Sequence, residues 1–400
     1  MKPSGIEWIG DIPEDWEVCR LKRCLTIQNG LDYKSVRDDN GEFPVIGSGG
    51  QFDFASKYLY NGESVLFGRK GTVDKPLYVN GKFWTVDTMF YSMIKPNACG
   101  KFIFYAATTI PFNFYSTATA VPSMTQRDLI NHYIVLPPLS KQRLIADYLD
   151  EKCWEIDATI AKQKESIEKL KAYKQSLISE TVTKGLDKSA PLKPSGIEWI
   201  GNIPYDWEIR KVKNTGKLIG GSGFPEEYQG VKDEKIPFIK VKSLAEDPIS
   251  RNGKDSISES IRSKLNAEKF IKGSVVFAKV GAALLLQRFR ILEFDSCIDN
   301  NMMGFIPLVI EPRFFKYVTI LFDFSYFVNP GTVPSINQEQ IGNIKIPFPP
   351  LKSQEKIADY LDGKCSQIDK YITEKQNIIQ KLDAYKKSLI FESITGKQKI

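Results

Sequence analysis

The feature that most constrains this chain is an internal repeat. The nine residues KPSGIEWIG occur at Lys2–Gly10 and again at Lys193–Gly201. A longer stretch, VPSMTQRDLINHYIVLPPLSKQRLIADYLDEKCWEID, ends at Asp157, and a close variant of it ends at Asp369. Since 400 residues suffice for two or more domains, the sequence predicts two copies of one architecture.

The two copies agree at their flanks and differ in their interiors. VLFGRKG at Val65–Gly71 resembles VVFAKVG at Val275–Gly281. The offset between copies grows from 191 residues at Lys2 to 212 between Asp87 and Asp299, so the second copy is 21 residues longer. Two copies that share their flanking sequences but differ in their interiors are expected to keep one fold while contacting different targets. The extra residues could lengthen a binding loop or only extend the surface.

Each interior is predicted to mix strands and helices. Short β-branched and aromatic runs, such as SVLFG and NMMGFIPLVI, are separated by Gly, Pro, Asn and Asp. Ser123 with Gln126, and Ser335 with Gln338, have the form of a helix capping box. The expected fold class is α+β, with two globular regions of mixed β-sheet and helix separated by helical spacers. The expected regions, in order, are 1–139, 140–190, 191–350 and 351–400.

A heptad pattern of apolar residues follows each interior and predicts two long helices. The seam positions are Ile156, Ile160, Ile167, Leu170 and Leu177 in the first copy, and Ile368, Ile372, Ile379, Leu382 and Leu389 in the second. We expect the helices to pack as an antiparallel coiled coil with pseudo-twofold symmetry. Parallel pairing is the competing arrangement.

Antiparallel pairing makes two further predictions. The polar seam residues would share layers, with Gln163 near Lys386 and Lys174 near Lys375. The last residues of the sequence would lie near Lys2, because the first helix leads to the same motif in the second copy.

Composition narrows the class of protein without deciding its function. The net charge of +7 permits a nucleic-acid partner but does not require one. There is no run of 18 apolar residues and no secretory signal, so a cytoplasmic protein is expected. The six cysteines form no CxxC pair, and one histidine cannot complete a zinc set with them, so no metal is expected.

No motif supports catalysis by this chain. Adenine methyltransferases carry an Asn-Pro-Pro-Tyr type of motif, and nucleotide phosphates are held by a G-x4-G-K-S/T loop; neither is present. The glycine-rich stretches Gly47–Gly50 and Gly220–Phe224 lack the strand–turn–helix context of a dinucleotide site and are expected to be plain turns. No paired carboxylates stand out as acid and base. We expect a protein that is not an enzyme and holds no cofactor.

The order of these segments resembles the specificity subunit of type I restriction–modification systems. The resemblance covers nearly the whole chain, and it rests on Pro137–Lys152, Pro349–Lys364, Ala172–Leu186 and the two KPSGIEWIG motifs. It implies two target-recognition domains, each reading one half of a split DNA sequence. It also implies that the helical regions act as a spacer and as a docking surface for partner subunits.

The resemblance further implies partners and cofactors. Double-stranded DNA, two modification (methyltransferase) subunits and restriction (motor-nuclease) subunits are the expected partners, with no membrane. S-adenosylmethionine and ATP are expected only on partner subunits. Two alternatives stay open: a two-headed DNA-binding adaptor or repressor without a methyltransferase partner, and a single-chain nuclease or methyltransferase, which the missing motifs disfavour.

Contacts with DNA are expected from Lys and Arg, which bind phosphates, and from side chains that reach base edges. Arg69 and Lys70 follow a predicted strand and precede a glycine, so an exposed turn is expected there; Lys279 is aligned with Arg69. The other candidates are Lys240, Lys242, Arg288, Arg290 and Lys34, with Gly49 and Gly50 allowing close backbone approach.

Each candidate has a plainer alternative. Arg69 could be a solvated turn charge without a role. Arg288 and Arg290 are expected on one face of a strand, and either could pair with Glu293 or Asp295 instead. Weaker candidates are Tyr33 and Arg37, and a structural role is favoured for Trp8, Trp16, Trp199 and Trp207.

Overall fold

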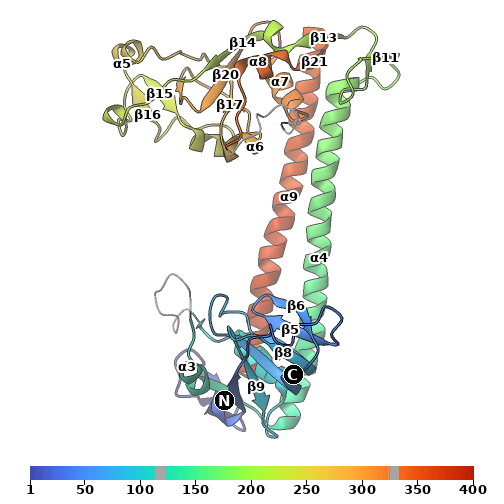
Figure 1. Cartoon of the computed structure of the whole chain (residues 1–400), viewed down its shortest axis with the longest axis vertical. Helices are drawn as coiled ribbons and strands as arrows, with labels where there is room; N and C mark the ends of the chain where they lie inside the picture. Colours follow the sequence, from blue (N-terminus) through green and yellow to red (C-terminus); the bar gives the residue numbers. More distant parts are fainter. Residues whose placement is uncertain (113–122, 323, 325–332) are drawn as a thin grey trace. The chain divides into compact units, whose positions relative to one another are not determined.

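The computed structural model describes residues 1–112, 123–322, 324 and 333–400 (Figure 1). The chain divides into a first unit, Met1–Glu165 with Glu374–Ile400, and a second unit, Ser166–Thr373. Two long helices, α4 (Leu139–Lys184) and α9 (Leu351–Ile394), each contribute to both units. Each unit therefore combines one mixed α/β region with part of each long helix.

A six-stranded sheet forms the centre of the first unit, in the order β4-β9-β7-β8-β5-β6. Neighbouring strands are antiparallel except β5 and β8, which are parallel. Helix α1 (Gly100–Thr108) packs on β7 and β8 and buries Phe102 and Ile103. The strands are β4 (Leu25–Asn29), β5 (Phe43–Gly47), β6 (Gly50–Ala55), β7 (Tyr60–Gly68), β8 (Leu77–Thr85) and β9 (Met89–Ile94).

The second unit follows the same plan with two smaller sheets, β14-β20-β17-β18 and β16-β15-β19. Its strands are β14 (Gly216–Gly220), β15 (Ile236–Ile239), β16 (Asp255–Ile257), β17 (Val275–Ala278), β18 (Arg290–Ile291), β19 (Cys297–Ile298) and β20 (Met302–Pro307). The parallel pair β15–β19 corresponds to β5–β8. Most of the extra residues of this copy lie between β15 and β17. Strand β16 in this stretch pairs with β15 as β6 pairs with β5, so it has a counterpart in the first copy. The stretch also contains η4 (Val241–Ala245) and α5 (Glu259–Lys264), so the added length is folded rather than a free loop.

Short elements join each α/β region to the helices, and they occur in matched pairs. The paired strands are β1 (Lys2–Pro3) with β2 (Asp11–Ile12), β3 (Glu17–Arg20) with β10 (Tyr133–Leu136), β11 (Leu192–Pro194) with β12 (Asn202–Pro204), and β13 (Glu208–Lys211) with β21 (Lys345–Phe348). The matched helices are α3 (Gln126–Asn131) with α8 (Gln338–Asn343), and α1 with α7 (Pro312–Thr319). The exit strands β10 and β21 lie where the sequence predicts them.

The segments that directly follow the two KPSGIEWIG motifs meet the ends of the long helices. Gly396 follows α9 in a left-handed conformation (φ +74°), and a side chain there would overlap Pro13 and touch Trp16. Gly185 follows α4 in the same conformation (φ +78°) and lies against Trp207. The prediction that the last residues lie near the start of the chain is therefore confirmed.

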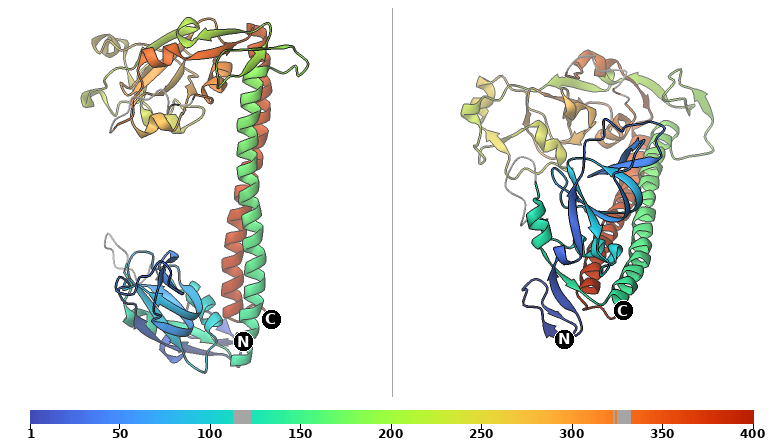
Figure 2. Two further views of the ribbon diagram at one scale, coloured as in Figure 1. Left: turned by 45° about the vertical axis from the view of Figure 1, so that its right-hand side comes forward. Right: turned by 60° about the horizontal axis from the view of Figure 1, so that its bottom comes forward.

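Helices α4 and α9 lie side by side and run antiparallel within each unit (Figure 2). In the first unit, Ile156 and Ile160 share a core with Leu389. In the second unit, Ile178 shares a core with Leu361. All ten predicted seam residues are buried or half-buried. Within the described residues, no helix has an apolar stretch long enough to cross a membrane.

The predicted register of the polar seam residues is wrong. In the first unit Lys386 bonds to Asp157 at 2.6 Å, and Gln163 accepts from Lys375 at 3.1 Å. In the second unit Lys174 bonds to Asp369 at 2.6 Å, the counterpart of the Lys386–Asp157 pair. The predicted layers left each lysine beside an amide or another lysine. The observed register gives both lysines a carboxylate instead, which long flexible stems can reach from a seam position.

The predicted capping boxes are also wrong in position. Ser123 and Ser335 are still extended and form bridges with Lys70 and Val280, two residues before each helix is capped. Thr125 caps α3, and Asn337 caps α8 in a capping box. The side chain that caps a helix must directly precede it, and here the chain turns later than the sequence pattern suggests.

Candidate nucleic-acid interface

Two equivalent turns carry Arg69 and Lys279. The first turn (Arg69–Gly71) follows β7, and the second turn (Lys279–Gly281) follows β17. The carbonyl oxygen of Arg69 accepts from Met124 N at 3.1 Å, and that of Lys279 accepts from Ile336 N at 2.9 Å. Both turns end in a left-handed glycine, with φ of +82° and +75°. We call these the two cationic turns.

The side chains of Arg69 and Lys279 lie at matching places on the two sheets. The guanidinium of Arg69 lies 5.9 Å from the ring centre of Phe90, which pairs with Asn29 at the end of β4. A Cβ on Gly220, the counterpart of Asn29 on β14, would lie 3.3 Å from Lys279 Nζ. Among the described residues, neither cation forms an ion pair. Both are therefore available to an external anion such as a phosphate.

The hairpin between β5 and β6 presents open backbone. No described atom lies within 4 Å of a Cβ built on Gly49 or Gly50, and Gly50 has a φ of +105°. Lys34 is exposed nearby in sequence, whereas Arg37 is held by Asp53 at 3.0 Å. The glycines leave room for a close approach to the backbone, as expected.

Lys240 and Arg290 do not offer free charges. Lys240 Nζ bonds to Asp255 at 2.6 Å, with both side chains mostly covered. The Nε of Arg290 donates to the carbonyl oxygen of Glu246 at 2.7 Å, and a terminal nitrogen lies 3.7 Å from Asp247. Burial lowers the pKa of Arg290 from its ordinary value. Both residues are better explained as structural cations than as DNA contacts.

Arg288 and Arg290 are not neighbours on one strand. The chain turns at Leu286 and Gln287, and Arg288 lies between this turn and the start of β18 at Arg290. The alternative that Arg290 pairs with Glu293 or Asp295 is wrong, because its carboxylate neighbour is Asp247. Arg288 is half-buried and, within the described chain, forms no ion pair. The candidates that keep uncompensated charge are Arg69, Lys70, Lys279, Lys242, Arg288 and Lys34.

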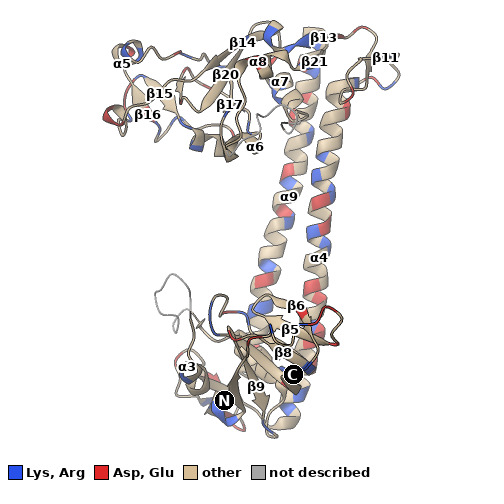
Figure 3. Ribbon diagram, in the orientation of Figure 1, with Lys and Arg blue, Asp and Glu red and all other residues tan. Residues whose placement is uncertain are grey.

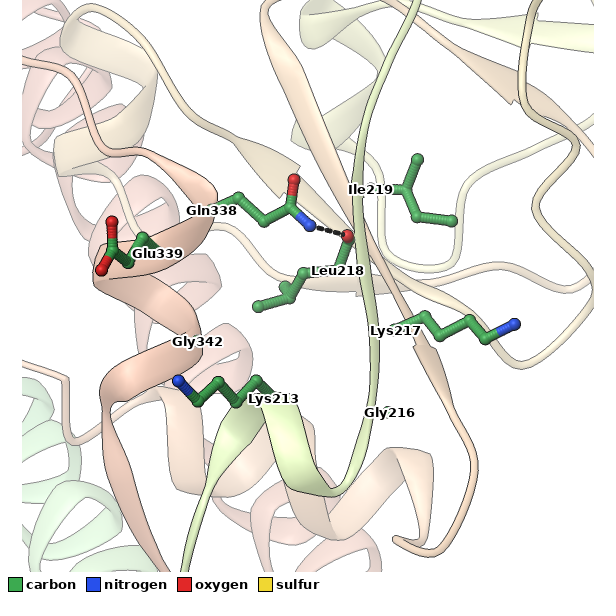
Figure 4. A pocket seen from close by; sticks show the side chains of 8 residues that line it. All are labelled: Lys213, Gly216, Lys217, Leu218, Ile219, Gln338, Glu339 and Gly342. Atoms are coloured by element: carbon green, nitrogen blue, oxygen red, sulfur yellow. Dashed lines mark hydrogen bonds between the residues drawn. The ribbon is translucent and has the colours of Figure 1, made fainter.

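A surface hollow of about 630 Å³ lies between η2 (Val212–Asn214), β14 and α8 in the second unit (Figure 4). Gln338 Nε2 donates to the carbonyl oxygen of Leu218 at 2.6 Å. Lys213 and Lys217 point in opposite directions (Figure 4), so the two lysines do not converge on one anion. In the described parts of the chain, no group of His, Cys, Asp and Glu could hold a metal ion.

Charges of both signs occur along α4 and α9 (Figure 3). A surface that binds a nucleic-acid backbone along its length usually carries one sign of charge. Contact with DNA is therefore expected from the α/β regions and their turns rather than from the helices.

Two matched glycines, at the ends of β4 and β14, have a structural role that was not predicted from the sequence. Gly30 and Gly221 directly follow β4 and β14, and each is pressed against backbone of a neighbouring segment. The signal was present, because both glycines follow aligned strands at the 191-residue offset. Glycine at such a place indicates close approach of another backbone.

Comparison with known proteins identifies a family. A family model described as type I restriction modification DNA specificity domain matches residues 13–172 and 204–384. The chain is 24% identical over 420 residues to the type I restriction enzyme MjaVIII specificity subunit of Methanocaldococcus jannaschii, covering 97% of this chain and 94% of that protein. It is 21% identical over 435 residues to the EcoKI specificity subunit of Escherichia coli K12, covering 97% and 90%.

Solved structures share the fold. A chain from a study of assembly and conformational transition of the type I R-M system has a TM-score of 0.74 at 15% identity, covering 97% of this chain and 100% of that one. The HsdS subunit from Thermoanaerobacter tengcongensis has a TM-score of 0.54 at 17% identity, covering 97% and 98%. At these identities the likeness shows the fold alone.

Proposed function

The chain belongs to the family of type I restriction–modification DNA specificity proteins, and we propose that it recognises a split DNA sequence within a type I restriction–modification complex. The observation that carries this is the family match itself, which falls on both copies of the repeat. The comparisons do not favour a stand-alone adaptor or repressor. We propose no catalytic role for this chain.

Each α/β region would read one half of the DNA target. The cationic turns stand at equivalent places in the two copies, so Arg69 and Lys279 would hold phosphates in equivalent ways. The side chains around them differ between copies, so the two half-sites are expected to differ in sequence. The open Gly49–Gly50 backbone would allow the first copy a second close contact.

We infer that two methyltransferase subunits dock on α4 and α9. Tyr173 and Tyr385 occupy equivalent positions on the two helices and are 58% and 57% exposed. Large exposed aromatic side chains are typical of protein interfaces, and a matched pair suits two copies of one partner. S-adenosylmethionine would bind to those subunits, and ATP to restriction subunits.

The test of this function is a methylome. The chain is co-expressed with the methyltransferase subunit of its own system, and the host genome is sequenced for methylated adenine. We expect a split motif that is methylated on both strands. Replacing residues 193–350 with those of a relative should change one half of the motif and leave the other unchanged. A stable complex of the two chains that adds no methylation would contradict the proposal.

Removing one cation from either turn should weaken DNA binding. We expect Arg69→Ala and Lys279→Ala each to lower affinity for the split sequence about tenfold, because each loses one phosphate contact. The slope of log affinity against log salt should fall by about 1 for each variant. Fluorescence anisotropy at several salt concentrations measures both quantities.

Lys240→Ala and Arg290→Ala serve as matched controls. They remove the same charge as Lys279→Ala from the same α/β region, but both cations already have protein partners. We expect a lower unfolding temperature with an unchanged salt slope. A salt slope that falls for the controls as much as for Lys279→Ala would argue against the assignment of the turns.

A further inference from the structure

Two exposed leucines stand side by side directly after the second cationic turn. Helix α6 (Ala282–Leu285) begins after Gly281, and Leu285 and Leu286 are 57% and 56% exposed. Adjacent large apolar side chains at this exposure are unfavourable in water unless something covers them. They stand in a region already proposed to face DNA.

The leucine pair is held rigidly from both sides. Leu284, just before it, is buried, and Phe289, just after it, is buried and stacks on Phe277 at 4.5 Å. Between them, Gln287 adopts a left-handed backbone (φ +49°), which is uncommon outside glycine. Its side chain donates to the carbonyl oxygen of Phe322 at 3.0 Å and so fixes this turn. The two leucines thus protrude from a preorganised support.

Cations flank the leucine pair. Lys279 precedes it, and Arg288 follows it by two residues; among the described residues, neither forms an ion pair. Leu286 and Arg288 line the same surface hollow of about 560 Å³. The other basic groups of that hollow are compensated, as Lys316 pairs with Asp247 at 2.8 Å. The leucines therefore lie, along the sequence, between two cations that have no ion pair among the described residues, and one of these cations, Arg288, shares a hollow with Leu286. This arrangement suits a ligand with an apolar interior and an anionic rim.

Among the described residues, the first copy has no comparable apolar pair after its cationic turn. There Val73 is buried at 5% exposure and Pro76 is also buried, while Thr72, Asp74 and Lys75 are exposed. The leucine pair is therefore not part of the shared frame. A feature present in one copy only is expected to act on one half of the target.

We propose that Leu285 and Leu286 form an apolar wedge that enters the DNA at the half-site read by the second copy, partly separating two stacked base pairs. This inference rests on the proposed function. Lys279 and Arg288 would hold phosphates on either side of the wedge. Leucine is one of the side chains that open a base step in this way, and the opened step bends the duplex. Because base steps differ in how easily they unstack, the wedge would add sequence preference without a hydrogen bond to a base.

Double-stranded DNA fits the leucine pair better than a protein partner does. A protein interface is depleted in charged residues at its centre and in lysine as a whole. Here Lys279 belongs to the turn that directly precedes α6, and it has a counterpart in Arg69 at the equivalent place on the first sheet. Docking of a protein on the leucines is the alternative that the experiment separates.

The experiment uses the full chain, co-purified with its methyltransferase subunit, and a duplex carrying the split sequence found by methylome sequencing. 2-Aminopurine is placed in turn at each step of both half-sites, and dyes at the duplex ends report bending by energy transfer. With the unaltered protein we expect raised 2-aminopurine fluorescence at one step of the second half-site and at none of the first. The Leu285→Ala, Leu286→Ala double variant should lose that signal, reduce the bend and bind about tenfold more weakly, the scale of 1.4 kcal/mol.

The salt dependence separates a wedge from a charge contact. Losing apolar contact releases no counterions, so the double variant should keep the salt slope of the unaltered protein, whereas Lys279→Ala should lower it. Leu308→Ala is the matched control: Leu308 is 64% exposed and follows Pro307, at the opposite end of β20 from Met302 beside the second turn. Leu308→Ala should leave the 2-aminopurine signal, the bend and the affinity unchanged.

Three outcomes would overturn the wedge. Equal 2-aminopurine signals for the double variant and the unaltered protein would leave no role for the leucines in unstacking. Loss of the methyltransferase subunit from the double variant on size-exclusion chromatography, with normal bending by the complex that remains, would assign the leucines to protein docking. If the unaltered complex shows no preference for the split sequence, the proposed function fails first and the wedge fails with it.

Discussion

Replacing Gly30 or Gly221 with alanine is expected to destabilise the unit that contains it by about 3 kcal/mol. A Cβ on Gly30 would overlap the carbonyl oxygen of Val86, and one on Gly221 would overlap that of Asp299. Both obstacles are backbone atoms, so no side chain can rotate out of the way. Each substitution must push apart two segments at the edge of the surface proposed to bind DNA.

Urea unfolding of the full chain, followed by tryptophan fluorescence and circular dichroism, measures the loss. Gly49→Ala and Gly223→Ala are the matched controls, one in each unit, because no described atom lies within 4 Å of a Cβ at either site. We expect these controls to change the free energy of unfolding by less than about 0.5 kcal/mol. Equal stability of Gly30→Ala and Gly49→Ala would show that the backbone contact at Gly30 has no energetic weight.

The α+β class, the long helices and their antiparallel pairing could all be predicted from the sequence. Each rests on a pattern that burial imposes directly. Apolar residues spaced by three and four, such as Ile156 and Ile160, must lie on one helix face. The repeated KPSGIEWIG motif predicted the antiparallel pairing, because the end of each long helix must then lie beside a copy of the same motif.

Register and caps could not be predicted, because they depend on choices between near-equivalent partners. Lys386 can extend its stem across the seam to Asp157 or toward an amide on the facing helix. A heptad pattern fixes which face is buried, but it does not say where a flexible charged end will bind. Likewise, Thr125 and Ser123 are both good capping residues, and only the path of the preceding strand selects between them.

The candidate site was predicted best where the two copies could be compared. Arg69 and Lys279 were found because they align, and they lie on equivalent turns. The partners of Lys240 and Arg290, Asp255 and Glu246, could not be predicted because they lie between β15 and β17, where the second copy is longer. Strand β16 pairs with β15 as β6 pairs with β5, but the added residues hide this match in the sequence.

The stability of the first unit should depend on one imidazole. His132 is the single histidine of the chain, is 3% exposed, and stacks on the Trp8 ring at 5.5 Å. Burial lowers the pKa of His132 from 6.5 to about 4. Below pH 6.5 the imidazole is protonated in the unfolded chain, whereas in the folded chain it stays neutral down to about pH 4. The stability that this neutral imidazole gives is therefore complete above pH 6.5 and is lost as the pH falls, by up to about 3 kcal/mol.

The second copy supplies the control for this prediction. Ile344 occupies the position equivalent to His132, and it is also 3% exposed. His132→Ile should therefore fold and should lose this part of the acid sensitivity, since isoleucine cannot titrate. Proton NMR of the single imidazole gives its pKa, and urea unfolding between pH 7 and pH 4 gives the difference in stability. The prediction would be wrong if the imidazole titrates near pH 6.5, or if stability falls equally with and without it. Either result would mean that burial does not disfavour the protonated form of His132.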